Sequence, residues 1–168
     1  MPFISFGEIF PQIAMKETRS LIITRDSVIP PDTYTFVELY CSDPECDCRM
    51  VRISVLSEIG PSHAEISYGW HEKRYYRGPS NDFAENGLPG PSCSFGAIQG
   101  SFAHIFLEKF KELFLPDFDY VNRLKRHYAL IKREYQRIDL KKSLPSRVKI
   151  ITREKKIKDG FNGRKISL

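Results

Sequence analysis

The chain of 168 residues has no stretch that approaches the roughly 18 apolar residues needed to cross a bilayer. Its first residues also lack a basic segment, and Glu8 and Pro11 interrupt the apolar ones, which is not the pattern of a secretory signal. These absences predict a cytoplasmic protein with no membrane segment. Thiols stay reduced in that compartment, so clustered cysteines indicate a metal site or catalysis before a disulfide.

Familiar catalytic motifs are also missing. There is no G-x-S-x-G, no P-loop and no dinucleotide fingerprint, and HEKR at 71–74 lacks the second histidine of H-E-x-x-H. A pairing of Cys93 with His104 is conceivable, with the imidazole polarising the thiol. The missing motifs nevertheless favour a binding protein over an enzyme.

What is present is the composition of a folded domain, with 41% apolar and 28% charged residues. A chain near this length buries roughly 68–70% of its unfolded surface, so it can form a core without disulfides. We expect a single α+β domain over residues 1–145, followed by a basic, loosely ordered tail over 146–168.

Four segments are typical of strands. Residues 16–24 are rich in β-branched side chains, and 34–41, 50–57 and 63–70 alternate in polarity. Short loops join the last three, which predicts an antiparallel β-meander with one covered face. Residues 78–100 are rich in Gly and Pro, and we expect them to form a long loop.

Two helices are predicted after this loop. Apolar residues recur at helical spacing over 101–114, with Ser101 as the expected N-cap. Asp117 can cap a second helix whose apolar stripe includes Leu124 and Ile131. Packed over one face of the meander, the two helices would complete an α+β fold. Residues 148–151 are expected to form a short strand in the tail.

Three cysteines occur within eight residues, in the segment YCSDPECDCRM at 40–50. Cys41 ends one predicted strand, and Asp43-Pro44 favours a turn before Cys46 and Cys48. A hairpin would bring the three sulfurs together at its tip. Zinc binds thiolates in a tetrahedron at about 2.3 Å, so we predict a structural Zn²⁺ site.

The fourth ligand of this site must come from elsewhere in the chain. Cys93 is the first choice, because its Gly/Pro-rich loop can fold back, and His71 and His63 follow. The C-x4-C-x-C spacing also leaves open an iron–sulfur cluster, a redox pair, or cysteines buried as small apolar side chains. An EF-hand is excluded, because its loop needs twelve residues with a glycine at the sixth.

Charge is divided unevenly along the chain. Residues 121–168 contain 16 Lys/Arg against 4 Asp/Glu, whereas 1–120 contain 10 against 17. This division favours a basic surface for an anionic partner, either nucleic acid or an acidic protein, although the basic part can instead dock on its own acidic part. The residues predicted to contact phosphate are Arg123, Lys125, Arg126, Lys132 and Arg133.

Other polar and aromatic residues are secondary candidates. The tail lysines Lys155, Lys156, Lys158 and Lys165 would add affinity without reading sequence. In YGWHEKRYY at 68–76, aromatics interleaved with Lys73 and Arg74 can stack on nucleic acid, or the segment is simply a strand leaving the sheet. We expect His127 at the surface or at a helix cap.

Several segments together resemble a family of uncharacterised bacterial proteins. They are ETR at 17–19, FVELYCSDPECDCRMVRISVL at 36–56, ISYGW at 66–70 and YVNRLKRHY at 120–128. The resemblance spans most of the chain, and its cysteine motif falls on Cys41, Cys46 and Cys48. It implies a domain with a cysteine cluster and nothing about substrate, and Cys93 lies outside the resembling segments.

The leading hypothesis is a zinc-binding module for an anionic partner. The alternative is a metal- or thiol-dependent enzyme with an open coordination position. A third hypothesis is an interaction scaffold without metal.

Overall fold

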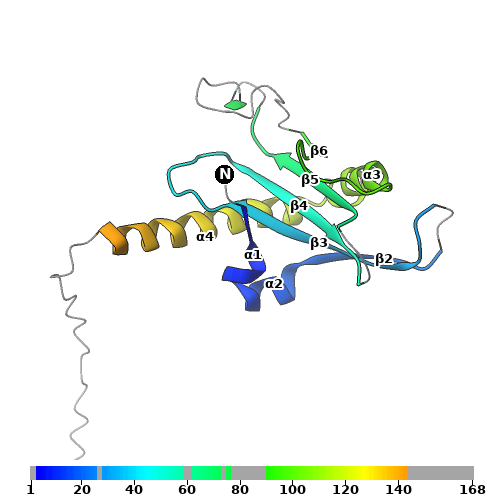
Figure 1. Cartoon of the computed structure of the whole chain (residues 1–168), viewed down its shortest axis with the longest axis horizontal. Coiled ribbons are helices and arrows are strands. Elements are labelled where there is room, and N and C mark those ends of the chain that lie inside the picture. The colour runs from blue at the N-terminus through cyan, green and yellow to red at the C-terminus, as the bar shows by residue number, and fades with distance from the viewer. Residues whose placement is uncertain (1–2, 26–27, 59–61, 73–74, 77–89, 144–168) are drawn as a thin grey trace, which may run out of the picture.

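The structure is a computed structural model that describes residues 3–25, 28–58, 62–72, 75–76 and 90–143 (Figure 1). Some of the predictions fall outside these ranges. They concern Lys73, Arg74, the part of the long loop before residue 90, the short strand at 148–151 and the tail lysines.

The N-terminal part of the fold was not foreseen from the sequence. It consists of β1 (Phe3–Ser5), the short helices α1 (Phe6–Ile9) and α2 (Pro11–Glu17), and β2 (Arg19–Ile23). Pro11 occupies the first turn of α2, where a missing N–H breaks no helical hydrogen bond. The predicted strand at 16–24 is therefore confirmed only for Arg19–Ile23.

The described strands form one antiparallel sheet of six strands. The central meander of β3 (Asp32–Cys41), β4 (Met50–Leu56) and β5 (Ala64–Gly69) confirms the prediction. β1 and β2 share the free edge of β3, since β1 pairs with its last three residues and β2 with its first five.

A sixth strand, β6 (Ser92–Cys93), lies within the segment predicted to be a loop. It pairs with β5 and places Cys93 opposite Ile66. Two residues are too short to show a two-residue period, which is why the sequence pattern missed this strand. Cys93 is consequently held at a sheet edge instead of lying in a loop that can fold back.

The two predicted helices, α3 (Ala103–Leu113) and α4 (Phe118–Ser143), are present and pack on one face of the sheet (Figure 1). Asp117 caps α4 as expected, since its Oδ1 accepts hydrogen bonds from the N–H groups of Asp119 and Tyr120 at 3.0 and 3.1 Å. The expected cap at Ser101 is wrong, because α3 starts after Phe102 without a side-chain cap bond. In the described part of the chain, no helix has the length and apolarity to cross a membrane.

The core lies between this sheet face and the helices. Strand register puts Phe36 opposite Val55 and Ile53 opposite Ile66, and all four are fully buried. Each apolar side chain buried in this way contributes roughly 1.5–3 kcal/mol. Because side chains alternate along a strand, the same face of β3 carries Glu38 into the interior, where it is 5% exposed.

Candidate metal centre

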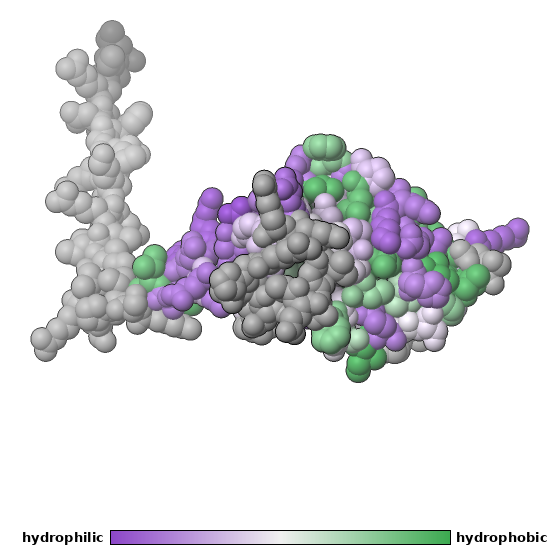
Figure 2. Space-filling view, turned by 90° about the horizontal axis from the view of Figure 1, so that it is seen from above, coloured by the Kyte–Doolittle hydropathy of each residue, from purple (hydrophilic) through white to green (hydrophobic). Residues whose placement is uncertain are grey.

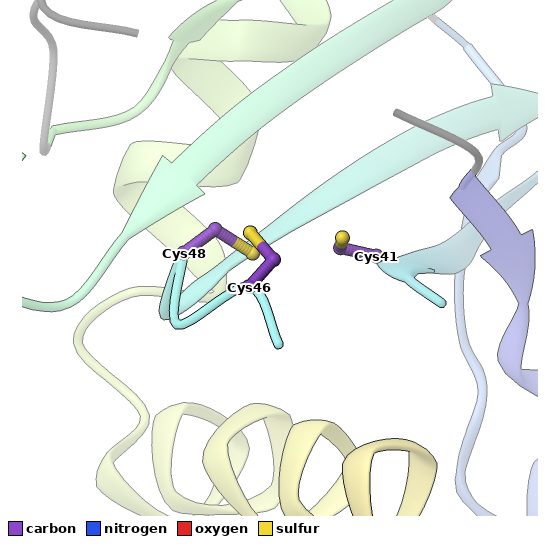
Figure 3. Close-up of side chains that lie close together, drawn as sticks. All are labelled: Cys41, Cys46 and Cys48. Atoms are coloured by element: carbon purple, nitrogen blue, oxygen red, sulfur yellow. The ribbon is translucent and has the colours of Figure 1, made fainter. Parts of the chain in front are cut away.

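The three clustered cysteines lie at one end of the β3–β4 hairpin (Figure 3). Cys41 is the last residue of β3, whereas Cys46 and Cys48 belong to the connection to β4. The three Sγ atoms lie within 4.8 Å of one another. The predicted convergence of the sulfurs is confirmed, and the cluster can hold a metal ion.

Local backbone chemistry explains this convergence. The Oδ1 atom of Asp43 accepts a hydrogen bond from the Glu45 N–H at 2.9 Å, and its carbonyl accepts one from the Cys46 N–H at 3.3 Å. An aspartate that bonds the backbone two residues later is typical of a turn. The turn directs Cys46 back towards the end of β3, where Cys41 lies.

The cluster has a size that suits zinc. Three sulfurs bonded to one tetrahedral zinc ion at about 2.3 Å are separated by about 3.8 Å. The three Sγ atoms, within 4.8 Å of one another, have separations of that order. None of the four cysteines, all of which lie in the described ranges, forms a disulfide.

The residue after the cluster has an unusual backbone conformation. Arg49 has φ of 43°, a region that residues with a Cβ rarely adopt. Its N–H donates to the Tyr128 hydroxyl at 3.4 Å, and its carbonyl accepts from the Tyr76 hydroxyl at 2.9 Å. Its side chain bonds to Asp47 and lies 3.0 Å from Nε2 of His71. These contacts hold the strained residue that leads the chain from Cys48 into β4.

Three tyrosines thus support the cysteine loop from outside. Tyr76 and Tyr128 bond to Arg49, and the Tyr75 hydroxyl donates to the Asp47 carbonyl. Sequence patterns suggested either stacking or a departing strand for Tyr75 and Tyr76. The partners of the three tyrosine hydroxyls lie 27 to 79 residues away, and no sequence motif records such a pairing.

Lys132 approaches the cluster from α4. It is 8% exposed, and its Nζ donates a hydrogen bond to the Asp43 carbonyl at 2.6 Å. Its aliphatic stem packs in the interior while its ammonium group lies beside the cysteine loop. The positive charge offsets the negative charge that three thiolates would bring together.

The three thiols of the cluster differ in pKa. The hydrogen bond from Cys48, helped by a backbone N–H at Asp43 and by the Lys132 charge, lowers the pKa of Cys41 despite burial. Donating that bond raises the pKa of Cys48, and burial raises the pKa of Cys46. Sulfurs this close do not all ionise without a cation between them, and a bound divalent metal is such a cation.

The fourth ligand expected from the sequence is not at the cluster. Every cysteine and histidine of the chain lies in the described ranges. Cys93 is paired in β6, and His63 bonds to the Ser57 hydroxyl at 2.8 Å. His71 lies against Arg49, as noted above. Among the described residues, the group of potential ligands that meets here is the cysteine triad alone.

The five basic residues predicted to contact phosphate divide into three groups. Arg123 and Lys132 are 7% and 8% exposed, and they bond to the buried Glu38 and to the Asp43 carbonyl, so both charges are engaged within the fold. The reason is that α4 turns them towards the sheet. Arg126 pairs with Glu17 at the surface. The remaining two, Lys125 and Arg133, are exposed and form no ion pair with any described residue.

His127 is also buried, at 1% exposure, so the expectation of a surface position is wrong. Its Nδ1 lies 2.6 Å from Glu38 Oε2, and its Nε2 lies 3.0 Å from Glu17 Oε2. Its ring stacks on Phe6 with centroids 3.8 Å apart. The covering residues come from the N-terminal helices, which the sequence pattern did not indicate.

Neither a family model, nor a curated protein, nor a solved structure matches this chain. Fold and site together define its class, an α+β protein with a three-cysteine cluster at a hairpin tip.

Proposed function

We propose that this protein binds zinc through Cys41, Cys46 and Cys48, and that the ion fixes the tip of the β3–β4 hairpin beside α4. The proposal rests on one observation, the convergence of three sulfurs within 4.8 Å around which Lys132 and the tyrosines form a supporting layer. Such outer contacts orient metal ligands and tune affinity.

The ligand set favours zinc over other metals. Thiolates select zinc, Cu(I) or iron–sulfur clusters. Iron–sulfur clusters are usually held by four cysteines, and Cys93 is not part of this group. A tetrahedral zinc site accepts three thiolates together with a ligand of another kind.

The test is metal analysis of the whole chain purified without a His-tag. We expect one zinc per chain, and a marked loss of zinc in a Cys46→Ser variant. Cys93→Ser is the matched control, because both cysteines are partly exposed and both changes are isosteric. At free zinc 100-fold above Kd, the ion should add about 2.7 kcal/mol to the unfolding free energy.

Protein that contains no zinc and takes none up would contradict the proposal. So would equal zinc content in the Cys46→Ser variant and the native protein.

We propose, second, that the outer face of α4 binds an anionic partner, with nucleic acid as the first candidate. α4 contains eight Lys/Arg against three Asp/Glu. The surface at the end of the molecule where α4 projects is largely hydrophilic (Figure 2). Lys125 and Arg133 are exposed on α4 and have no ion pair among the described residues, which leaves their charges available to phosphate.

Binding of mixed-sequence DNA and RNA, measured by fluorescence anisotropy at rising salt, tests this second proposal. We expect binding near 50 mM salt that weakens steeply as salt rises, because phosphate contacts release counterions. The double variant Lys125→Glu/Arg133→Glu should lose most of it. The control double variant Arg25→Glu/Lys111→Glu changes the net charge by the same amount at residues outside α4, and it should lose less of the binding. Absence of binding at low salt would contradict the proposal.

A further inference from the structure

A hollow of about 520 Å³ opens beside the cysteine cluster, between its loop and α4. Residues 44–47 form one wall, and Tyr128, Lys132 and Arg133 contribute to the other. Cys46 lines this hollow and is partly exposed, whereas Cys41 and Cys48 are buried. A metal ion held by the three sulfurs would therefore meet solvent on the Cys46 side.

Among the described residues, no fourth protein ligand belongs to the cysteine group on that side. The remaining histidines, His104 on α3 and the buried His127, do not belong to the cysteine group. Of the nearby carboxylates, Asp43 bonds to the Glu45 N–H, and Asp47 bonds to Arg49 and Tyr128. Glu45 lines the hollow but does not belong to the group of ligand atoms that lie within 4.8 Å of one another. Three-ligand zinc sites generally take water or substrate as the fourth ligand.

We propose that the fourth coordination position of the zinc faces this hollow and takes an exchangeable ligand from solution. Water holds the position at rest, and a small soft anion, the thiolate of a low-molecular-weight thiol, replaces it. The thiol releases its proton to solvent, the water leaves as the thiolate binds, and the oxidation state of the metal does not change. This open position presupposes the zinc site proposed above.

The charges around the hollow favour an anion there. Zinc with three thiolates has a net charge of about −1, and a fourth thiolate makes it more negative. Positive side chains nearby are therefore needed to offset this charge. Lys132 lies beside the cluster, and the exposed Arg133 lines the entrance. Of the acids lining the same hollow, Asp47 is neutralised by Arg49, which leaves Glu45 as the opposing charge.

The whole chain loaded with Co²⁺ in place of zinc tests this inference, with mercaptoethanol as the probe. Tetrahedral cobalt absorbs in the visible, and each bound thiolate adds charge-transfer absorption in the near ultraviolet. A saturable rise in that absorption, with the cobalt still bound after gel filtration, supports the open position. A spectrum that mercaptoethanol leaves unchanged overturns the inference while the zinc site stands. Failure to bind either metal overturns the proposed function itself.

Variants of the chain test whether the fourth ligand comes from the protein and where mercaptoethanol binds. Cys93→Ser and His71→Ala should leave the starting spectrum unchanged, and a changed spectrum in either one would identify a fourth protein ligand and overturn the inference. Arg133→Glu should weaken mercaptoethanol binding roughly threefold to tenfold through charge repulsion. Lys125→Glu is the matched control, an exposed residue of α4 that does not line the hollow. Equal affinities in these two variants would overturn the placement of the ligand in this hollow.

Discussion

Two arginines three residues apart on α4 each pair with a glutamate, one in the interior and the other at the surface. Arg123 is buried, and its Nη2 lies 2.9 Å from Glu38 Oε1, whose side chain is 4% exposed. Arg126 is 57% exposed, and its partner Glu17 is also partly exposed. A buried pair is costly to break because its remaining charge stays in the interior, whereas a surface pair is screened by water.

We therefore expect Arg123→Ala to lower the unfolding free energy by about 3–5 kcal/mol. Arg126→Ala, the matched control, should lower it by at most about 1 kcal/mol. Urea unfolding of both variants at neutral pH measures the difference. Similar losses in the two proteins would mean that Arg123 is not held in the interior as described.

At the scale of elements, the cysteine loop depends on support from segments distant in sequence. The Tyr76 hydroxyl bonds to the Arg49 carbonyl and accepts a hydrogen bond from the His71 N–H at 3.3 Å. A Cβ at Gly69, the last residue of β5, would collide with this hydroxyl, so the glycine leaves room for the bond. The position of Cys48 is thus set by contacts between elements as well as by its own turn.

We expect Tyr76→Phe to lower zinc affinity by roughly tenfold, because removal of an outer contact typically weakens metal binding by 10–100-fold. Tyr135→Phe removes a hydroxyl from α4 away from the loop and is the control. Competition with a chromophoric chelator measures both affinities. An unchanged affinity in Tyr76→Phe would show that the turn holds the cysteines without this tyrosine.

At the scale of the whole molecule, one buried polar network joins the N-terminal helices, the sheet and α4. Glu38 on β3 receives hydrogen bonds from Tyr40, Arg123 and His127. His127 also contacts Glu17, the last residue of α2. Burial opposes ionisation of Glu38, but His127 and Arg123 outweigh it, so the pKa of Glu38 lies below its ordinary value.

This lowered pKa gives the stability a defined pH dependence. The ionised Glu38 contributes fully above the pKa of an unfolded glutamate, about 4.3, and its contribution is lost as pH falls through the lower folded value. Glu38→Gln should be less stable at neutral pH and should lose less stability than the native protein as the pH falls below about 4.3. The comparison is made by urea unfolding with a chelator present, so that metal release does not contribute. Parallel pH profiles would contradict the assigned role of Glu38.

Much of this arrangement was accessible from sequence patterns. The alternation in 50–57 and the helical spacing after Asp117 depend on neighbours within a few residues, and both elements were placed correctly. The cysteine cluster was accessible for the same reason, because a short turn brings Cys46 and Cys48 to the end of β3. The N-terminal helices and β6 are too short to produce a periodic signal.

The sequence by itself determined the longer local elements, the α+β class and the meeting of three cysteines, because these follow from periodicity and from one turn. Only the tertiary structure decided the orientation of α4, which turns Arg123 and Lys132 inward and leaves Lys125 and Arg133 outside. The pairing of Arg123 with Glu38, 85 residues away, likewise depends on how whole elements pack. Such contacts are selected by the shape and charge of two packed surfaces, and no short stretch of sequence contains both.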